Sequence, residues 1–128
     1  MGLRIFKEPF NVFEEQIRRF RKECKENYCA LVLLVLCNNQ LCVEDIHQND
    51  RLREKFKLAL NLCEMLTNTA PSTIGDALKT LQGFLIKKID DTYHFYHDFV
   101  MEVTTYVFGT DYPRETLRSQ FGHKRTKE

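Results

Sequence analysis

The sequence is poor in glycine, and its few glycines lie far apart. They are Gly2, Gly75, Gly83, Gly109 and Gly122. A loop that cradles phosphate needs glycines a few residues apart, because its backbone must approach the phosphate closely. The chain therefore lacks the phosphate-binding motifs of nucleotide-dependent enzymes. We expect it to hold no cofactor and to bind ATP or ADP with no useful affinity by itself.

Neither an excess of charge nor a long apolar run is present. The chain has 19 Lys and Arg against 18 Asp and Glu, a net charge of +1. This balance gives no general attraction to nucleic acid or to an anionic membrane. The longest apolar run, Cys29–Cys37, is far shorter than the roughly twenty residues that span a bilayer. With 43% apolar residues and no export signal at its start, the chain is expected to be one cytoplasmic globular domain without a membrane partner.

The cysteines occur in an odd number and form no Cys-x-x-Cys pair. The five are Cys24, Cys29, Cys37, Cys42 and Cys63. An odd count without an export signal predicts reduced thiols. Structural zinc sites usually take their ligands in closely spaced pairs, so the sequence predicts no metal site. No cysteine falls after a strand or at a helix start with charge to lower its pKa. The adjacent carboxylate pairs Glu14-Glu15 and Asp90-Asp91 are typical of a solvated face and a hairpin turn. We therefore expect no catalytic residue and no enzyme activity.

Helical periodicity dominates the first two-thirds of the chain. Asn11 can cap a helix over about Asn11 to Glu26, in which apolar residues recur at helical spacing, with acidic residues early and basic residues late. The segment Tyr28–Cys37 is apolar all round, which fits a buried strand or a buried helix, and its helical flanks favour the helix. Asn38-Asn39 is a turn signal. Asp50 then caps an amphipathic helix, and Ser72 caps a shorter one that Gly83 ends.

The pattern changes to that of strands in the last third. Phe84–Ile89 and Thr92–Tyr96 are rich in β-branched and aromatic residues and predict one hairpin. Asp98 is placed to cap a helix that ends at Gly109, and Pro113 can start a last helix with Leu117 and Phe121. The prediction is a mainly α fold with one β-hairpin, winged-helix-like. We expect a lead over residues 1–10, the domain over 11–109, and a C-terminal helix and frayed tail over 110–128.

Many winged-helix domains bind DNA, and this is the alternative function. A DNA-reading helix carries an excess of Arg and Lys. The candidate recognition helix, Ser72–Leu81, has only Lys79, which Asp76 opposes. The expected wing carries Lys87 and Lys88, but Asp90 and Asp91 follow them. These charges argue against nucleic acid as a partner.

The strongest local feature is an imidazole where the second strand meets the following helix. The run Tyr93–Phe99 places His97 and Asp98 at this junction. One reading is purely structural: His97 is a satisfied junction residue and Asp98 only a helix cap. The other reading comes from a family resemblance.

Several short sequence segments, taken in this order and spacing, carry that resemblance. They are Pro9-Phe10 before a charged helix, the run Tyr28–Leu36, Gly83–Lys88, Tyr93–Asp98 and Val107-Phe108-Gly109. Together they resemble the winged-helix segment that follows the nucleotide-binding core in STAND-class signalling NTPases, especially the animal "novel STAND" group. The resemblance covers about Pro9 to Phe121.

The resemblance implies a site and a partner. In related plant disease-resistance and apoptosome NTPases, a Met-His-Asp motif ends the wing, and its His contacts the β-phosphate of bound ADP. Tyr96-His97-Asp98 occupies the similar place here, with Tyr in place of Met. The resemblance therefore implies that His97 senses nucleotide and that Asp98 orients it. It also implies a non-catalytic regulatory module that packs on an NTPase core of the same or another chain and meets ADP or ATP only through that core.

Overall fold

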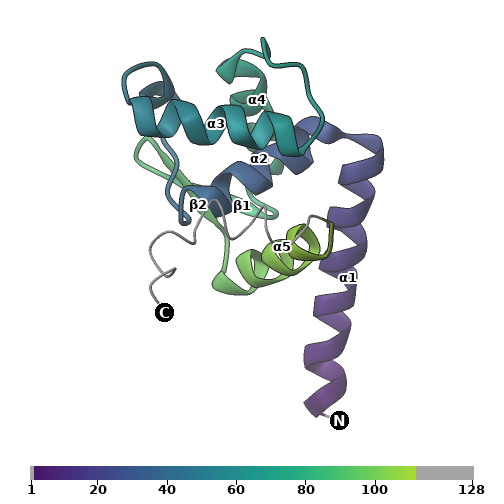
Figure 1. The fold of residues 1–128 in the computed structure, drawn as a ribbon. Coiled ribbons are helices and arrows are strands. Elements are labelled where there is room, and N and C mark those ends of the chain that lie inside the picture. The colour runs from purple at the N-terminus through teal and green to yellow at the C-terminus, as the bar shows by residue number, and fades with distance from the viewer. Residues whose placement is uncertain (1, 112–128) are drawn as a thin grey trace, which may run out of the picture.

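The computed structural model describes residues 2–111, which form a helical domain with one hairpin (Figure 1). Its α-helices are α1 (Gly2–Glu23), α2 (Lys25–Leu36), α3 (Asp50–Leu62), α4 (Pro71–Leu81) and α5 (Asp98–Asp111). A short 3-10 helix, η1 (Val43–His47), precedes α3, and the strands are β1 (Ile86–Ile89) and β2 (Thr92–Phe95). The predicted mainly α fold with a hairpin is confirmed, and its element order is that of a winged-helix-like domain. None of the helices in this range is long and apolar enough to cross a bilayer.

Helix α2 is the centre of the domain. Every residue from Asn27 to Leu36 is buried, and α2 contacts α1, α3, α4 and α5 (Figure 1). A helix that is apolar all round is stable only when neighbours cover it on every side. This arrangement explains the run without a polar face, and it confirms the helix predicted for that segment.

The wing is an antiparallel hairpin with an additional pairing on its outer edge. Ile86 pairs with Phe95 and Ile89 pairs with Thr92 along β1 and β2. On the other edge of β2, Leu41 exchanges two backbone hydrogen bonds with Tyr93, with N···O distances of 2.7 and 3.1 Å. Nothing in the sequence pattern around Leu41 predicts this contact. It attaches the loop after α2 to the wing.

The first helix boundaries differ from those predicted. Helix α1 begins at Gly2, so Asn11 lies within it, exposed, and is not its cap. The helix also ends at Glu23, because Cys24 leaves helical geometry with φ −147° and ψ 82° and α2 follows at once. The single helix expected to reach Glu26 is thus interrupted at Cys24, where the chain turns into the core.

The cap of α3 lies one residue earlier than predicted, and that of α4 lies two residues earlier, at Ala70. Asn49 caps α3, since its Oδ1 accepts a hydrogen bond from the Leu52 N–H at 3.1 Å. Helix α4 starts at Pro71 rather than at a Ser72 cap, and a proline there loses no hydrogen bond because the first helical N–H groups have no partner inside the helix. The predicted stop at Gly83 is confirmed: this residue follows α4 with φ +89°, which glycine adopts without strain.

Helix α5 passes through Gly109 and continues to Asp111, so the predicted stop at Gly109 is wrong. A glycine lowers helix stability by only about 1 kcal/mol, and the packing of α5 on α1 and α2 outweighs that local preference. The helix predicted after Pro113 lies outside the described residues.

Replacing Thr104 with valine should raise the free energy of unfolding by about 1–2 kcal/mol. Thr104 lies in α5 with no exposed surface, and within the described range its Oγ1 has no hydrogen-bond partner. Valine fills a similar volume without burying an unsatisfied hydroxyl. Urea denaturation measures the change. Thr104→Ser keeps the hydroxyl and loses a methyl group, so it should be destabilising by about 1 kcal/mol. Equal effects of the two variants would contradict this account.

Candidate functional site

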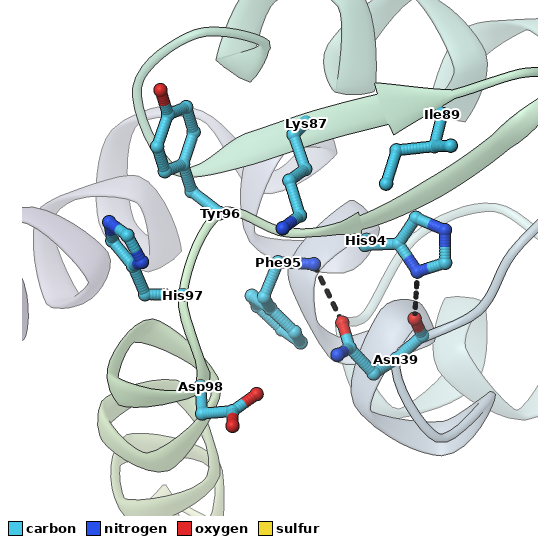
Figure 2. A pocket seen from close by; sticks show the side chains of 8 residues that line it. All are labelled: Asn39, Lys87, Ile89, His94, Phe95, Tyr96, His97 and Asp98. Carbon is cyan, nitrogen blue, oxygen red and sulfur yellow. Dashed lines mark hydrogen bonds between the residues drawn. The ribbon is translucent and has the colours of Figure 1, made fainter.

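A pocket of about 320 Å³ lies between the loop after α2, the hairpin and the start of α5 (Figure 2). It is lined by Asn39, Lys87, Ile89, His94, Phe95, Tyr96, His97 and Asp98. The pocket therefore includes both residues that the resemblance singles out. It also includes Asn39 from the loop after α2 and residues of β1 and β2, to which the resemblance assigns no role.

His97 lies at the junction with its side chain exposed. Its backbone carbonyl accepts hydrogen bonds from the N–H groups of Val100 at 3.0 Å and Met101 at 3.4 Å, so its main chain begins α5. The imidazole packs edge-to-face against the Tyr96 ring, 5.0 Å between centroids, and neither ring nitrogen has a hydrogen-bond partner among residues 2–111. The reading of His97 as a satisfied, buried junction residue is therefore wrong.

Asp98 is the first residue of α5, and its side chain is exposed. Because the His97 carbonyl already receives the first helical bonds, His97 occupies the cap position and Asp98 is not the predicted cap. A carboxylate in the first turn still interacts favourably with the helix dipole. The two side chains point to different sides of the junction in Figure 2, and within the described chain no hydrogen bond joins them. Orientation of His97 by Asp98 stays a prediction for the assembled state.

His94 is the histidine whose side chain makes a tertiary hydrogen bond among the described residues. Its Nδ1 lies 2.8 Å from the backbone oxygen of Asn39 (Figure 2). A carbonyl oxygen only accepts, so Nδ1 carries the proton and donates it, which leaves Nε2 open. The side chain of the same asparagine accepts a hydrogen bond from the Phe95 N–H at 2.6 Å. Asn39 therefore fastens the loop after α2 to β2 through two bonds.

The sequence pattern around Asn39 predicts a turn but not its bonds to β2. The sequence offered one signal here, the Asn38-Asn39 pair, which indicates a turn. In the structure both residues have positive φ, 59° and 69°. Asparagine tolerates this left-handed conformation better than most residues. Local pattern could thus find the turn, whereas the partner strand lies more than fifty residues away.

The pocket presents charges of both signs. Lys87 lines it from β1, and Asp98 lines it from α5. The neighbouring Lys88 instead places its Nζ 5.2 Å from the centre of the Tyr93 ring, a cation–π contact. The pocket can donate hydrogen bonds and offer one cation to an anionic group. The described residues place no nucleophile beside a base there.

The thiols of Cys29 and Cys37 are poor nucleophiles. A side-chain hydrogen bond with Cys63, together with burial, raises the pKa of Cys29. Burial raises the pKa of Cys37 to about 11, against a smaller opposing effect of the Lys55 charge. Since the thiolate is the reactive form, these groups are inert near neutral pH. In the described part of the chain, no group of three or more His, Cys, Asp or Glu side chains gathers as metal ligands.

The candidate recognition helix has no basic face. The exposed residues of α4 are Ser72, Asp76, Lys79 and Thr80. The charges of Lys79 and Asp76 cancel, whereas binding to DNA requires several cationic side chains that neutralise phosphates. The exposed side of α4 thus gives DNA binding no support.

Comparisons with models of known protein families, with curated proteins and with solved structures find no match to this chain.

Proposed function

We propose that the chain is a non-catalytic regulatory and interaction module. Its wing-to-helix junction packs against an NTPase core, of the same or another chain, and senses the nucleotide state of that core through His97. The observation that supports this most is the exposed imidazole, whose two ring nitrogens have no hydrogen-bond partner among residues 2–111. A neutral imidazole can donate one N–H to a phosphate oxygen, and the protonated form adds a charge-assisted bond.

The position of His97 suits a sensor because it belongs to two elements at once. It follows β2 directly, and its carbonyl begins α5. A contact between its ring and a phosphate would therefore bias the orientation of the wing and of α5 together. Coupling of this kind converts phosphate occupancy into a change of domain position. Lys87 lines the same pocket and adds a positive charge.

His97→Ala should accelerate ADP release from the assembled, resting NTPase about tenfold to a hundredfold. A hydrogen bond to a charged group contributes roughly 1.5–3 kcal/mol, and this one exists only in the closed arrangement. Stopped-flow release of a fluorescent ADP analogue from an ADP-loaded STAND-class core joined to this chain measures the rate. His47→Ala, at another exposed histidine, is the matched control and should leave release unchanged.

The same variant should leave the isolated chain almost as stable as the wild type, within about 0.5 kcal/mol, because the His97 side chain is exposed. Calorimetry of the isolated chain with ADP should detect no useful binding. Unchanged ADP release in the joined protein, or micromolar ADP binding by the isolated chain, would contradict the proposal. A steep salt dependence of binding to duplex DNA would favour the DNA-binding alternative instead.

A further inference from the structure

The outer face of the hairpin brings a lysine and a histidine together on one wall of the pocket. Lys87 of β1 and His94 of β2 are paired directly in the antiparallel register, so their side chains lie on the same face, and both line the pocket. Lys88 lies on the opposite face, because successive side chains of a strand alternate, and its Nζ is 5.2 Å from the centre of the Tyr93 ring. The hairpin thus presents one of these two lysines to the pocket.

The hydrogen bonds of Asn39 decide which donors remain for a ligand. Its side-chain oxygen accepts from the Phe95 N–H at 2.6 Å, and its backbone oxygen accepts from Nδ1 of His94 at 2.8 Å. The neutral His94 ring therefore offers only the lone pair of Nε2. The side-chain nitrogen of Asn39 keeps its N–H groups, for which no described residue is an acceptor. The donors left in the pocket are thus the Asn39 amide, the Lys87 ammonium and the His97 ring.

The Lys87 ammonium is available to a ligand. Its side chain is exposed, and within residues 2–111 it makes no ion pair. Figure 2 shows the ammonium near the middle of the pocket, with His97 on one side and Asn39 on the other. Asp98 also lines the pocket, but it lies in the first turn of α5, where the helix dipole offsets part of its charge. The groups around Lys87 therefore suit an anion.

The chemistry of these donors favours phosphate over carboxylate. An arginine guanidinium matches the two oxygens of a carboxylate, whereas a lysine ammonium is a point charge that suits phosphate, and none of the described residues that line the pocket is an arginine. The donors come from the loop after α2, from β1 and from the junction before α5. This distribution fits a ligand with several acceptor oxygens, as linked phosphates have.

We infer that Lys87 and the side-chain amide of Asn39 form an anion subsite for linked phosphates beside His97. Lys87 supplies the charge, and the bonds from Asn39 to β2 hold its amide in place before a ligand arrives. The identity of the ligand rests on the proposed function, in which the linked phosphates belong to the ADP of an NTPase core. A carboxylate of a partner protein is the competing ligand.

Inorganic pyrophosphate, titrated into the isolated, isotope-labelled full chain and followed by amide NMR, tests the subsite without an NTPase core. It should shift the signals of the Asn39 side chain and the Phe95 N–H with a Kd of about 1 mM, too weak for the isolated chain to hold nucleotide at micromolar concentration. Lys87→Gln should weaken this binding about tenfold, because it removes a hydrogen bond between charged groups. Lys88→Gln removes the same charge from the opposite face and should leave the binding unchanged.

Two further variants test the local charge and the amide. Asp98→Asn removes a negative charge from the pocket wall and should tighten pyrophosphate binding. Asn39→Asp keeps an acceptor for the Phe95 N–H but replaces the amide donors with a negative charge, so it should abolish binding. Circular dichroism of each variant confirms that the domain remains folded.

Three results would overturn the inference. Pyrophosphate that leaves the pocket signals unchanged would show that no subsite exists. Equal losses in Lys87→Gln and Lys88→Gln would show a general response to charge. Succinate that binds as tightly as pyrophosphate would assign the pocket to carboxylates of a partner protein. Each of these differs from failure of the proposed function, which is unchanged ADP release from the joined protein with His97→Ala.

Discussion

Replacing Asn39 with alanine should lower the free energy of unfolding by about 2–4 kcal/mol. The substitution removes the oxygen that accepts the hydrogen bond of the Phe95 N–H. Phe95 is only 1% exposed, so its N–H would be left buried without a partner, which costs about 1–3 kcal/mol. It also places a Cβ-bearing residue without a local hydrogen bond at φ +69°, a left-handed conformation that costs roughly 1–2 kcal/mol. Urea denaturation at a constant m-value measures the loss.

Two matched variants separate these causes. Asn38 is an exposed neighbour with φ 59°, and the bond to the Phe95 N–H is made by Asn39 instead. Asn38→Ala should therefore show only the cost of placing alanine in a left-handed conformation. Asn39→Asp keeps a side-chain acceptor for the Phe95 N–H and should retain most of the stability. If Asn38→Ala and Asn39→Ala were equally destabilising, the bond to β2 would contribute nothing, and the account of Asn39 as a fastening residue would fail.

Leu33→Ala should lower the free energy of unfolding by about 2–5 kcal/mol. Leu33 has no exposed surface and lies in the central turns of α2, where helices pack on every side. Truncation removes apolar burial and leaves a cavity that the surrounding helices cannot all close. The midpoint of urea denaturation should fall accordingly, while helical content below the transition stays near that of the wild type.

The control for this substitution is Leu66→Ala. Leu66 is 75% exposed in the loop between α3 and α4, so the same chemical change should alter stability by no more than about 0.5 kcal/mol. Similar losses at Leu33 and Leu66 would show that α2 is not the centre of the core. The comparison therefore tests whether the apolar run of α2 forms the centre of the core.

Sequence reasoning succeeded where the signal is local. Apolar spacing predicted the amphipathic α3 and α4, and the shift to β-branched and aromatic residues predicted β1 and β2. The stop at Gly83 was predictable because few other residues adopt φ +89° readily. In each case, the residues that create the preference lie within a few positions of the element they specify.

Helix ends were predicted less well, because a cap depends on where the chain leaves the helix. Asn11, Ser72 and Asp98 all have side chains that suit a cap, but each lies inside its helix. Packing against other elements decides whether the helix continues past such a residue. It carries α1 through Asn11 and α5 through Gly109, since the interactions gained across the domain exceed the small local preference.

The sequence by itself thus determined the elements, their order and the presence of an imidazole at the wing-to-helix junction. Only the tertiary structure decided which histidine the fold uses. His94 and Phe95 bond to Asn39 across 55 and 56 positions of sequence, whereas the His97 side chain is left exposed three positions after His94. Residues so far apart meet only when α2 is enclosed and its following loop is brought against β2. The residues adjacent in sequence therefore do not predict that contact.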